Sequence, residues 1–276
     1  FLGVDLGTSG VRIAVLNEKS ELLYSADISY KTGLQDSFEW VNCFQSLVCN
    51  IPVRLRNNLK ACAVDGTSGT LIACDLNGKP FGNALIYSQS CPEQEKNLLN
   101  YFPNGGILTN IDSSFARALR LVSEYGNNCL LRHQADWFNG WLTGDWNWGE
   151  EGNNLKLGWD LIKKTWPSNF VNLPWRKSLP EILPSGNVIA KIDHLRALNL
   201  ELPEDLLVIA GTTDSNAAVL SLDVEENDGI TVLGSTIVLK RFVKKPIKGV
   251  GITNHLINGK WLCGGSSNAG AAVLKK

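Results

Sequence analysis

Asp-Leu-Gly-Thr-Ser-Gly at residues 5–10 is the stretch that decides the fold. It follows the apolar run 1–4 and precedes a second apolar run, 11–16, so we expect a strand, a glycine-rich turn and another strand. Glycine lets the main chain approach an anion closely, while backbone amides and Ser or Thr hydroxyls donate hydrogen bonds to it. The turn is therefore typical of a phosphate-binding loop.

Three further clusters of similar composition each follow a short apolar run. They are Asp-Gly-Thr-Ser-Gly at 65–69, Gly-Thr-Thr-Asp at 211–214 and Gly-Ser-Thr at 234–236. A single turn of this kind usually only reverses the chain. Two nearly identical ones, each between apolar runs, favour a nucleotide or sugar site. Neither a P-loop nor a dinucleotide-binding fingerprint is present at the other glycine-containing segments.

Two aspartates lie beside these turns. Asp5 precedes the first turn and Asp214 ends the third. One carboxylate could manage a magnesium ion and the other could take a substrate proton, so the arrangement indicates phosphoryl transfer. Each also has an ordinary alternative, because Asp5 could be a turn aspartate and Asp214 a helix N-cap.

Composition narrows the class of partner. The chain has 26 basic and 27 acidic side chains, a balance that argues against nucleic acid or an acidic membrane and favours a small-molecule substrate. Its seven cysteines form no CxxC pair, which is typical of reduced thiols in a cytosolic protein. No stretch approaches the roughly twenty apolar residues that span a bilayer. We therefore predict a soluble, cytoplasmic protein.

The order of the predicted elements indicates an α/β protein with a mixed sheet. Strands are expected at 1–6, 11–16 and 21–30, followed by a helix whose apolar face begins at Trp40. Further predicted elements are strands at 60–65 and 70–76, a helix capped by Ser113 or Ser114, strands from 188 onward, an antiparallel set at 229–243 and 252–263, and a glycine-rich loop at 264–270 leading into a helix.

Residues 97–185 form a predicted helical and aromatic insertion that contains most of the nine tryptophans. The ordinary interpretation is that these rings anchor loops in a satellite core. The sharper interpretation is that an indole stacks against the face of a sugar.

The ordered set of motifs resembles the FGGY carbohydrate kinases, and the likeness runs through nearly the whole chain. Residues 1–10 look like the family's first phosphate hairpin, and 210–218 look like the segment with its catalytic aspartate. Residues 133–137 and 153–160 are similar to mid-domain segments of the family. Within the family, the turn at 65–69 and the run at 149–154 look most like ribulose or xylulose kinase-like members from photosynthetic organisms.

The resemblance implies an actin-like, ribonuclease H-like ATPase fold. Residues 1–263 would be the N-terminal sugar- and phosphate-binding domain of a two-domain sugar kinase. Residues 264–276 would begin a truncated C-terminal nucleotide-binding domain. Because the second domain supplies the adenine pocket in this family, a chain without it could bind sugar and phosphorylate nothing.

The resemblance also implies ATP-dependent phosphorylation of a ketopentose, D-ribulose or D-xylulose, at its terminal hydroxyl, with Mg2+. Asp214 would be the general base and also contact the sugar, and Asp5 would hold the metal ion through water. Ser68 would bind the sugar together with Gln89, since residues 87–91 lack the Asp and Arg usual there. The predicted contacts to ATP phosphates are Gly7, Thr8, Ser9, Gly234, Ser235 and Thr236.

Two alternatives remain open. One is a non-catalytic sugar-binding or regulatory module derived from such a kinase, favoured by the missing second domain and the missing Asp–Arg pair. The other is a chaperone-type ATPase of the same fold, which also opens with Asp-Leu-Gly-Thr. The tryptophan-rich insertion and the setting of Asp214 argue against the chaperone-type ATPase.

Overall fold

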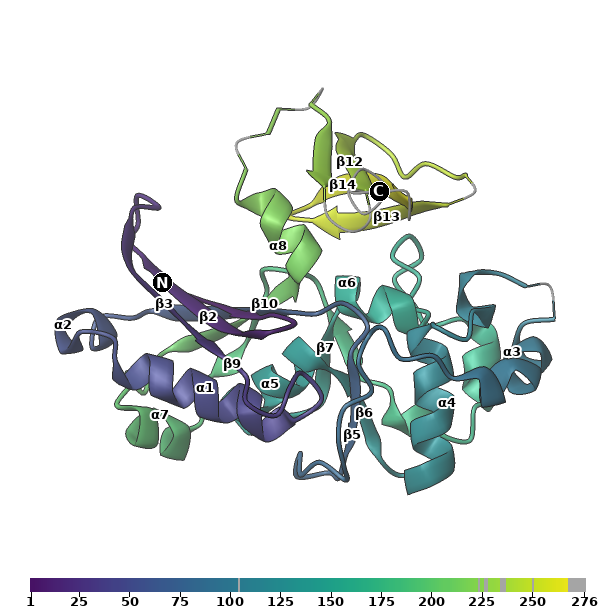
Figure 1. Cartoon of the computed structure of the whole chain (residues 1–276), viewed down its shortest axis with the longest axis horizontal. Helices are drawn as coiled ribbons and strands as arrows, with labels where there is room; N and C mark the ends of the chain where they lie inside the picture. Colours follow the sequence, from purple (N-terminus) through teal and green to yellow (C-terminus); the bar gives the residue numbers. More distant parts are fainter. Residues whose placement is uncertain (104, 223, 226–227, 234–236, 250, 268–276) are drawn as a thin grey trace. The chain divides into compact units, whose positions relative to one another are not determined.

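The structure of the chain is a computed structural model that describes residues 1–103, 105–222, 224–225, 228–233, 237–249 and 251–267 (Figure 1). The chain divides into two compact units, residues 1–215 and 216–276. The predicted boundary after residue 263 concerns the domains of a whole kinase and stays a prediction. None of the helices in the described part of the chain has the length and apolar composition needed to cross a bilayer.

The first unit is built on a six-stranded sheet with the order β3-β2-β1-β4-β10-β9. Strands β1, β4 and β10 are parallel neighbours, and the other pairs are antiparallel. The sheet is therefore mixed, as predicted, and the carboxyl ends of its three central strands meet at one edge. The strands are β1 (Leu2–Leu6), β2 (Gly10–Leu16), β3 (Leu22–Ser29), β4 (Ala61–Gly66), β9 (Val188–Lys191) and β10 (Leu207–Thr213).

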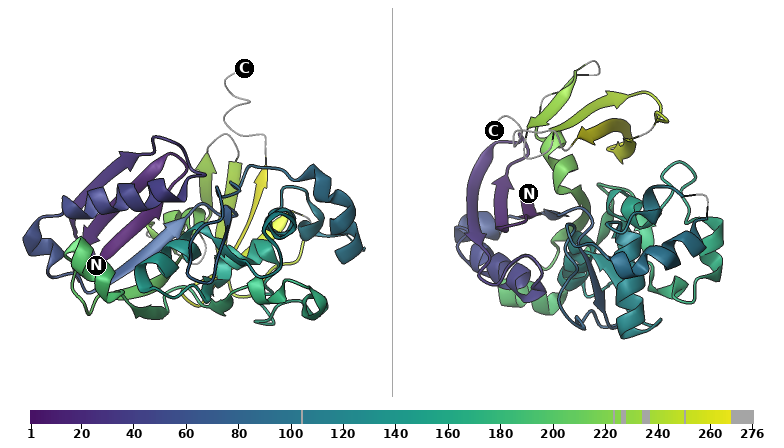
Figure 2. Two further views of the ribbon diagram at one scale, coloured as in Figure 1. Left: turned by 90° about the horizontal axis from the view of Figure 1, so that it is seen from below. Right: turned by 45° about the vertical axis from the view of Figure 1, so that its right-hand side comes forward.

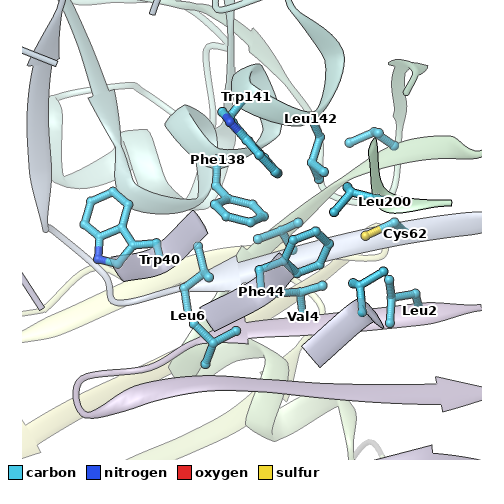
Figure 3. Close-up of a cluster of buried hydrophobic side chains, with 14 of the residues drawn as sticks. Leu2, Val4, Leu6, Trp40, Phe44, Cys62, Phe138, Trp141, Leu142 and Leu200 are labelled. Atoms are coloured by element: carbon cyan, nitrogen blue, oxygen red, sulfur yellow. The ribbon is translucent and has the colours of Figure 1, made fainter. Parts of the chain in front are cut away.

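Apolar and polar residues alternate along β1, so one face of the sheet is apolar and the other is polar at this strand. Leu2, Val4 and Leu6 are buried on one face, and the intervening Asp5 lies on the other, because successive side chains of a strand point to opposite faces. Three helices contribute to the core on the apolar face (Figure 3). They are α1 (Ser37–Cys49), α5 (Gln134–Thr143) and α7 (His194–Leu200).

Helix α1 lies along this face against β2 and β3, as the views in Figure 2 show. Asp36 caps it by accepting the amide hydrogen of Phe38 at 2.9 Å. Trp40 and Phe44 are fully buried at the predicted helical spacing, and the Phe44 ring meets the edge of Phe138 with centroids 5.1 Å apart. The helix expected from periodicity is confirmed.

A second core of the first unit forms around α4 (Ser114–Tyr125), whose predicted cap Ser113 accepts the amide hydrogen of Ala116. The strand expected at 70–76 is β5 (Leu71–Cys74), which pairs with β6 (Leu130–His133) in a separate two-stranded sheet. The remaining helices and strands of this unit are α2 (Val53–Arg56), α3 (Glu95–Tyr101), β7 (Trp148–Glu150), α6 (Glu151–Asn154) and β8 (Glu181–Leu183).

The tryptophans of the predicted insertion mostly serve the cores. Trp137 and Trp141 are buried beneath the main sheet, and Trp166 and Trp175 are buried in the second core. Burial of these rings against apolar neighbours favours the ordinary interpretation, in which they anchor the surrounding loops.

The second unit contains a four-stranded antiparallel sheet with the order β11-β12-β14-β13. Gly264–Ser267, predicted as a loop, instead continue β14, because each pairs with β12. A Cβ atom on Gly264 would lie 2.6 Å from the Leu239 carbonyl oxygen, so glycine is needed for close strand approach. The helix predicted beyond this segment lies outside the described residues. The elements are α8 (Asp214–Leu220), which starts in the first unit, β11 (Ile230–Leu233), β12 (Ile237–Val243), β13 (Ile252–Ile257) and β14 (Lys260–Ser267).

Candidate functional site

The ends of three parallel strands bring three carboxyl groups together in the first unit. Asp5 on β1 lies directly opposite Asp65 on β4 in the strand register, and Asp214 follows β10 at the same edge. Burial raises the pKa of Asp65 to about 8, and the negative charges of Asp5 and Asp214 add to the effect. The structure therefore brings the predicted Asp5 and Asp214 near each other and places Asp65 between them.

Asp65 was not among the predicted site residues. The signal was present, since Asp65 opens the near-repeat of the first turn. Parallel strands that end at one edge place such repeated positions side by side.

The segment before Asp214 differs from the prediction. Residues 211–213 are not a turn but the bulged end of β10, whose pairing with β4 shifts between Ala210 and Thr213. A Cβ atom on Gly211 would lie 2.0 Å from the Val64 carbonyl oxygen, so only glycine allows this approach. The bulge ends β10 and makes the half-buried Asp214 the first residue of α8.

The first glycine-rich turn is a tight, open connection between β1 and β2. The Gly7 amide donates to the Gly10 carbonyl oxygen at 3.0 Å. Thr8 and Ser9 are exposed, and neither hydroxyl has a hydrogen-bond partner among the described residues. Arg12 Nη1 donates to Asp5 Oδ2 at 2.7 Å, and this bond raises the pKa of the guanidinium. The exposed hydroxyl groups of Thr8 and Ser9 are therefore available to a ligand.

The second glycine-rich turn, residues 67–70, is packed. Thr67 is buried, and its amide and hydroxyl both donate to Gln134 Oε1, at 2.9 and 2.7 Å. Arg117 Nε donates to the Gly69 carbonyl oxygen at 3.0 Å, and Lys156 Nζ donates to the Ser68 carbonyl oxygen at 3.1 Å. Three side chains from distant parts of the sequence thus hold the backbone of this loop.

Arg117 also connects the segments that contain the two predicted sugar contacts, Ser68 and Gln89. Arg117 Nη1 donates to the carbonyl oxygens of Gln89, at 2.9 Å, and Tyr87, at 3.2 Å. The segment that contains Gln89 is thereby tied to the loop that contains Ser68. Sequence reasoning missed Arg117 and Gln134 as organisers of this region. Gln134 lies in a segment singled out for its family likeness, whereas Arg117 gave no signal.

Next to Gln134 begins a network of buried polar groups. Asp136 accepts the Glu150 amide hydrogen at 2.9 Å and a side-chain amide hydrogen of Asn154 at 2.8 Å. Burial raises the pKa of Asp136 to about 7 and that of Glu150 to about 8, and it lowers the pKa of His133 to about 3. His133 is therefore neutral near pH 7, and its 3.8 Å contact with Asp136 is not an ion pair.

The carboxyl groups at the strand ends fit a magnesium ion held through water. In the described part of the chain, no three or more His, Cys, Asp or Glu side chains are grouped to hold a metal ion directly. Mg2+ commonly uses only one or two carboxylates together with water and substrate phosphates. Asp5 is partly exposed, and the buried Asp65 Oδ1 has no hydrogen-bond partner among the described residues. The predicted phosphate contacts Gly234, Ser235 and Thr236 lie outside those residues.

Comparison with known proteins shows a likeness to sugar kinases. No family model matches it. A curated xylulose kinase from Lactococcus lactis is 24% identical over an alignment that covers 88% of this chain and 53% of that protein. This likeness to a xylulose kinase agrees with the predicted resemblance to the FGGY carbohydrate kinases. The chain spans about half the length of this curated relative, and the comparisons leave untested the predicted likeness to members from photosynthetic organisms.

Solved carbohydrate kinases share the fold of this chain. A xylulose kinase from Rhodospirillum rubrum superposes with a TM-score of 0.87 at 16% identity, covering 99% of this chain and 62% of that one. Ligand-bound xylulose kinase from Lactobacillus acidophilus gives 0.83 at 15% identity, with 99% and 61% covered, and Plasmodium falciparum glycerol kinase with ADP gives 0.82 at 15% identity, with 99% and 62% covered. The predicted actin-like fold is confirmed.

Proposed function

We propose that the chain carries the sugar- and phosphate-binding part of an ATP-dependent ketopentose kinase. The observation that supports this most is the meeting of Asp5, Asp65 and Asp214 at the ends of three adjacent parallel strands, beside an open glycine-rich turn. Ligands of open α/β sheets bind at the carboxyl ends of the strands. The kinship with a xylulose kinase favours D-xylulose or D-ribulose as the acceptor.

In this proposal Asp214 accepts the proton of the terminal sugar hydroxyl as that oxygen attacks the γ-phosphate of ATP, and ADP leaves. Its half-buried carboxylate starts α8 directly after the β10 bulge, so the main chain holds it in place. Ser68 and Gln89 lie on segments that Arg117 ties together, which favours their assignment to the sugar.

The nucleotide side of the proposal uses the first turn. ATP supplies the phosphoryl group when bound, and Mg2+ neutralises charge on its phosphates. Thr8 and Ser9 donate hydroxyl hydrogens to phosphate oxygens, Gly7 lets the main chain of the turn come close to them, and Asp5 holds the metal ion through water. Gly234, Ser235 and Thr236 are assigned to the phosphates as well.

The test is ADP release by the full-length protein with MgATP and one of D-ribulose, D-xylulose, L-ribulose or glycerol, comparing wild type with Asp214→Asn. We expect release that depends on a ketopentose and falls by roughly a hundredfold or more in the variant, because proton transfer to a positioned base contributes about that much. Sugar binding should persist in the variant, since asparagine keeps the size and one carbonyl oxygen of the side chain.

The alternative is a non-catalytic sugar-binding module. It predicts that sugar binds measurably while no sugar stimulates ADP release. Release without any dependence on sugar would contradict both functions.

A further inference from the structure

Lys156 lies against the packed loop that contains the predicted sugar contact Ser68. It belongs to a short 3-10 helix, Leu155–Leu157, that directly follows α6. Its ammonium group donates to the Ser68 carbonyl oxygen at 3.1 Å, and its Cδ atom would be 3.4 Å from a Cβ atom on Gly69. The side chain therefore extends along residues 68–69 and ends at the carbonyl of the residue expected to face the sugar.

Lys156 is also electrostatically linked to Asp214. Partial loss of water around its ammonium group and the nearby charge of Arg117 lower the pKa of Lys156, although the side chain as a whole is exposed, and Asp214 favours its charged form. Lys156 therefore contacts the loop of Ser68 and is near enough to Asp214 to respond to its charge, and both of those residues are assigned to the same substrate.

The ammonium group has donors to spare. Lysine carries three N–H donors, and within the described part of the chain Lys156 uses one of them, on Ser68. Arg117 is the other cation of this region, but it is fully buried and donates to the carbonyl oxygens of Gly69, Tyr87 and Gln89. Arg117 builds the loop, whereas the exposed Lys156 keeps donors that a ligand can reach.

We propose that Lys156 is a sugar-binding residue that donates hydrogen bonds to oxygen atoms of a neutral polyhydroxy substrate beside Asp214. This assignment rests on the proposed kinase function. A neutral substrate fits better than a sugar acid, because a carboxylate next to Asp214 would be repelled.

The experiment is calorimetric titration of the full-length protein with D-xylulose, D-ribulose and D-gluconate, and separately with MgADP. The variants are Lys156→Met, which keeps the length of the side chain without its charge, and Lys156→Arg, which keeps the charge. Lys163→Met is the matched control, because Lys163 is exposed in the same stretch of chain. Lys156→Met should fold, since Gln134 and Arg117 still hold the loop.

We expect Lys156→Met to weaken ketopentose binding by roughly tenfold or more, because a hydrogen bond from a charged donor is lost. Lys156→Arg should recover part of the affinity. MgADP binding should stay unchanged in both variants, and Lys163→Met should match wild type throughout. A merely structural role of Lys156 would not produce this restriction to sugar.

Three results would overturn the inference. Unchanged ketopentose affinity in Lys156→Met would exclude the contact while leaving the kinase function intact. Equal losses for sugar and MgADP would show a general structural effect instead. A wild type that prefers D-gluconate, and loses it in Lys156→Met, would replace the neutral substrate by a sugar acid. Failure of wild type to bind any ketopentose would instead contradict the proposed function itself.

Discussion

The two glycine-rich turns of the first unit have nearly the same sequence and different structures. The turn at 7–10 is exposed at its hydroxyl groups and is closed by a 3.0 Å backbone hydrogen bond from Gly7 to Gly10. The loop at 67–70 buries Thr67 and Thr70 and has its backbone held by Gln134, Arg117 and Lys156. A repeated motif therefore predicts where donors gather, whereas the surrounding side chains decide how those donors are used.

The difference suits two ligands of different kinds. An open turn can adjust its amides and hydroxyls around a phosphate, which is a compact anion with many acceptor oxygens. A packed loop presents a fixed surface, which suits a neutral sugar that must be recognised by the direction of each hydroxyl. In the proposed function, residues 7–10 therefore bind phosphate and residues 67–70 bind sugar.

The largest predicted effect is a pH dependence of the free energy of unfolding. It comes from the buried network next to the packed loop, and the open turn lacks such a network. The folded protein keeps the protons of Asp136 and Glu150 up to about pH 7 and 8, whereas the unfolded chain loses them near pH 4. Above pH 4 the unfolded state therefore binds fewer protons, so the free energy of unfolding falls as pH rises. Between pH 5 and pH 8 we expect a loss on the order of 6 kcal/mol from the two groups together.

Urea denaturation at pH 5, 6.5 and 8 measures this dependence. Asp136→Asn removes one of the titrating groups and should make the fall shallower. A free energy of unfolding that rises steadily from pH 5 to pH 8 would show that these carboxyl groups are ionised in the folded protein.

Gln134→Leu should produce the next largest effect. The substitution removes the oxygen that accepts both the amide hydrogen and the hydroxyl hydrogen of Thr67, and it leaves those donors buried. We expect the free energy of unfolding to fall by about 2 kcal/mol. Thr8→Ala, the matching change in the open turn, should stay within about 0.5 kcal/mol of wild type. Equal losses for the two variants in urea denaturation would remove the structural contrast between the loops.

A third comparison uses the glycines of the two loops. Gly69 has a φ of +99°, and an added Cβ atom would lie 3.2 Å from Arg117 Nη2, so Gly69→Ala should cost about 1–2 kcal/mol of unfolding free energy. Gly7 lacks a positive φ, and its added Cβ atom would lie 2.7 Å from the movable end of Arg12 and 3.3 Å from the Gly10 carbonyl oxygen. Gly7→Ala should therefore cost less than about 1 kcal/mol. Thermal unfolding of both variants checks the order, and a larger loss for Gly7→Ala would reverse it.

The smallest predicted effect is that of Arg12→Gln. The variant breaks the ion pair with Asp5, in which both side chains reach solvent. Exposed pairs of this kind contribute less than about 1 kcal/mol, and salt weakens them. The melting temperature should therefore change little, and the change should shrink further at high salt. A large loss that persists in 1 M salt, about ten times the ionic strength of ordinary buffers, would mean that Arg12 supports the turn by packing.

Periodicity and turn composition predicted much of the fold. The alternation along β1 and the spacing from Trp40 to Phe44 identified the central hairpin and α1, because these signals are local. The partner of β5 could not be predicted, since pairing with β6 depends on contacts between distant segments. The extension of β14 was missed because Gly264 and Gly265 usually indicate a turn, whereas here neighbouring strands pair on both sides.

Only part of the candidate site could be predicted from the sequence. Asp5 and Asp214 follow apolar runs, so their place at strand ends could be read from the sequence. Lys156 and Arg117 could not be found, because their roles come from hydrogen bonds to the backbone of residues 68 and 69, far away in the chain. Main-chain acceptors leave no residue pattern to recognise.

The most direct test of the assignment is to titrate two full-length variants with each ligand separately. One variant combines Thr8→Ala with Ser9→Ala in the open turn, and the other is Gly69→Ala in the packed loop. The account predicts that the first loses affinity for a non-hydrolysable MgATP analogue and keeps its affinity for D-xylulose, whereas the second shows the opposite pattern. If both variants weaken the same ligand, the two turns do not divide phosphate and sugar between them, and the central claim is wrong.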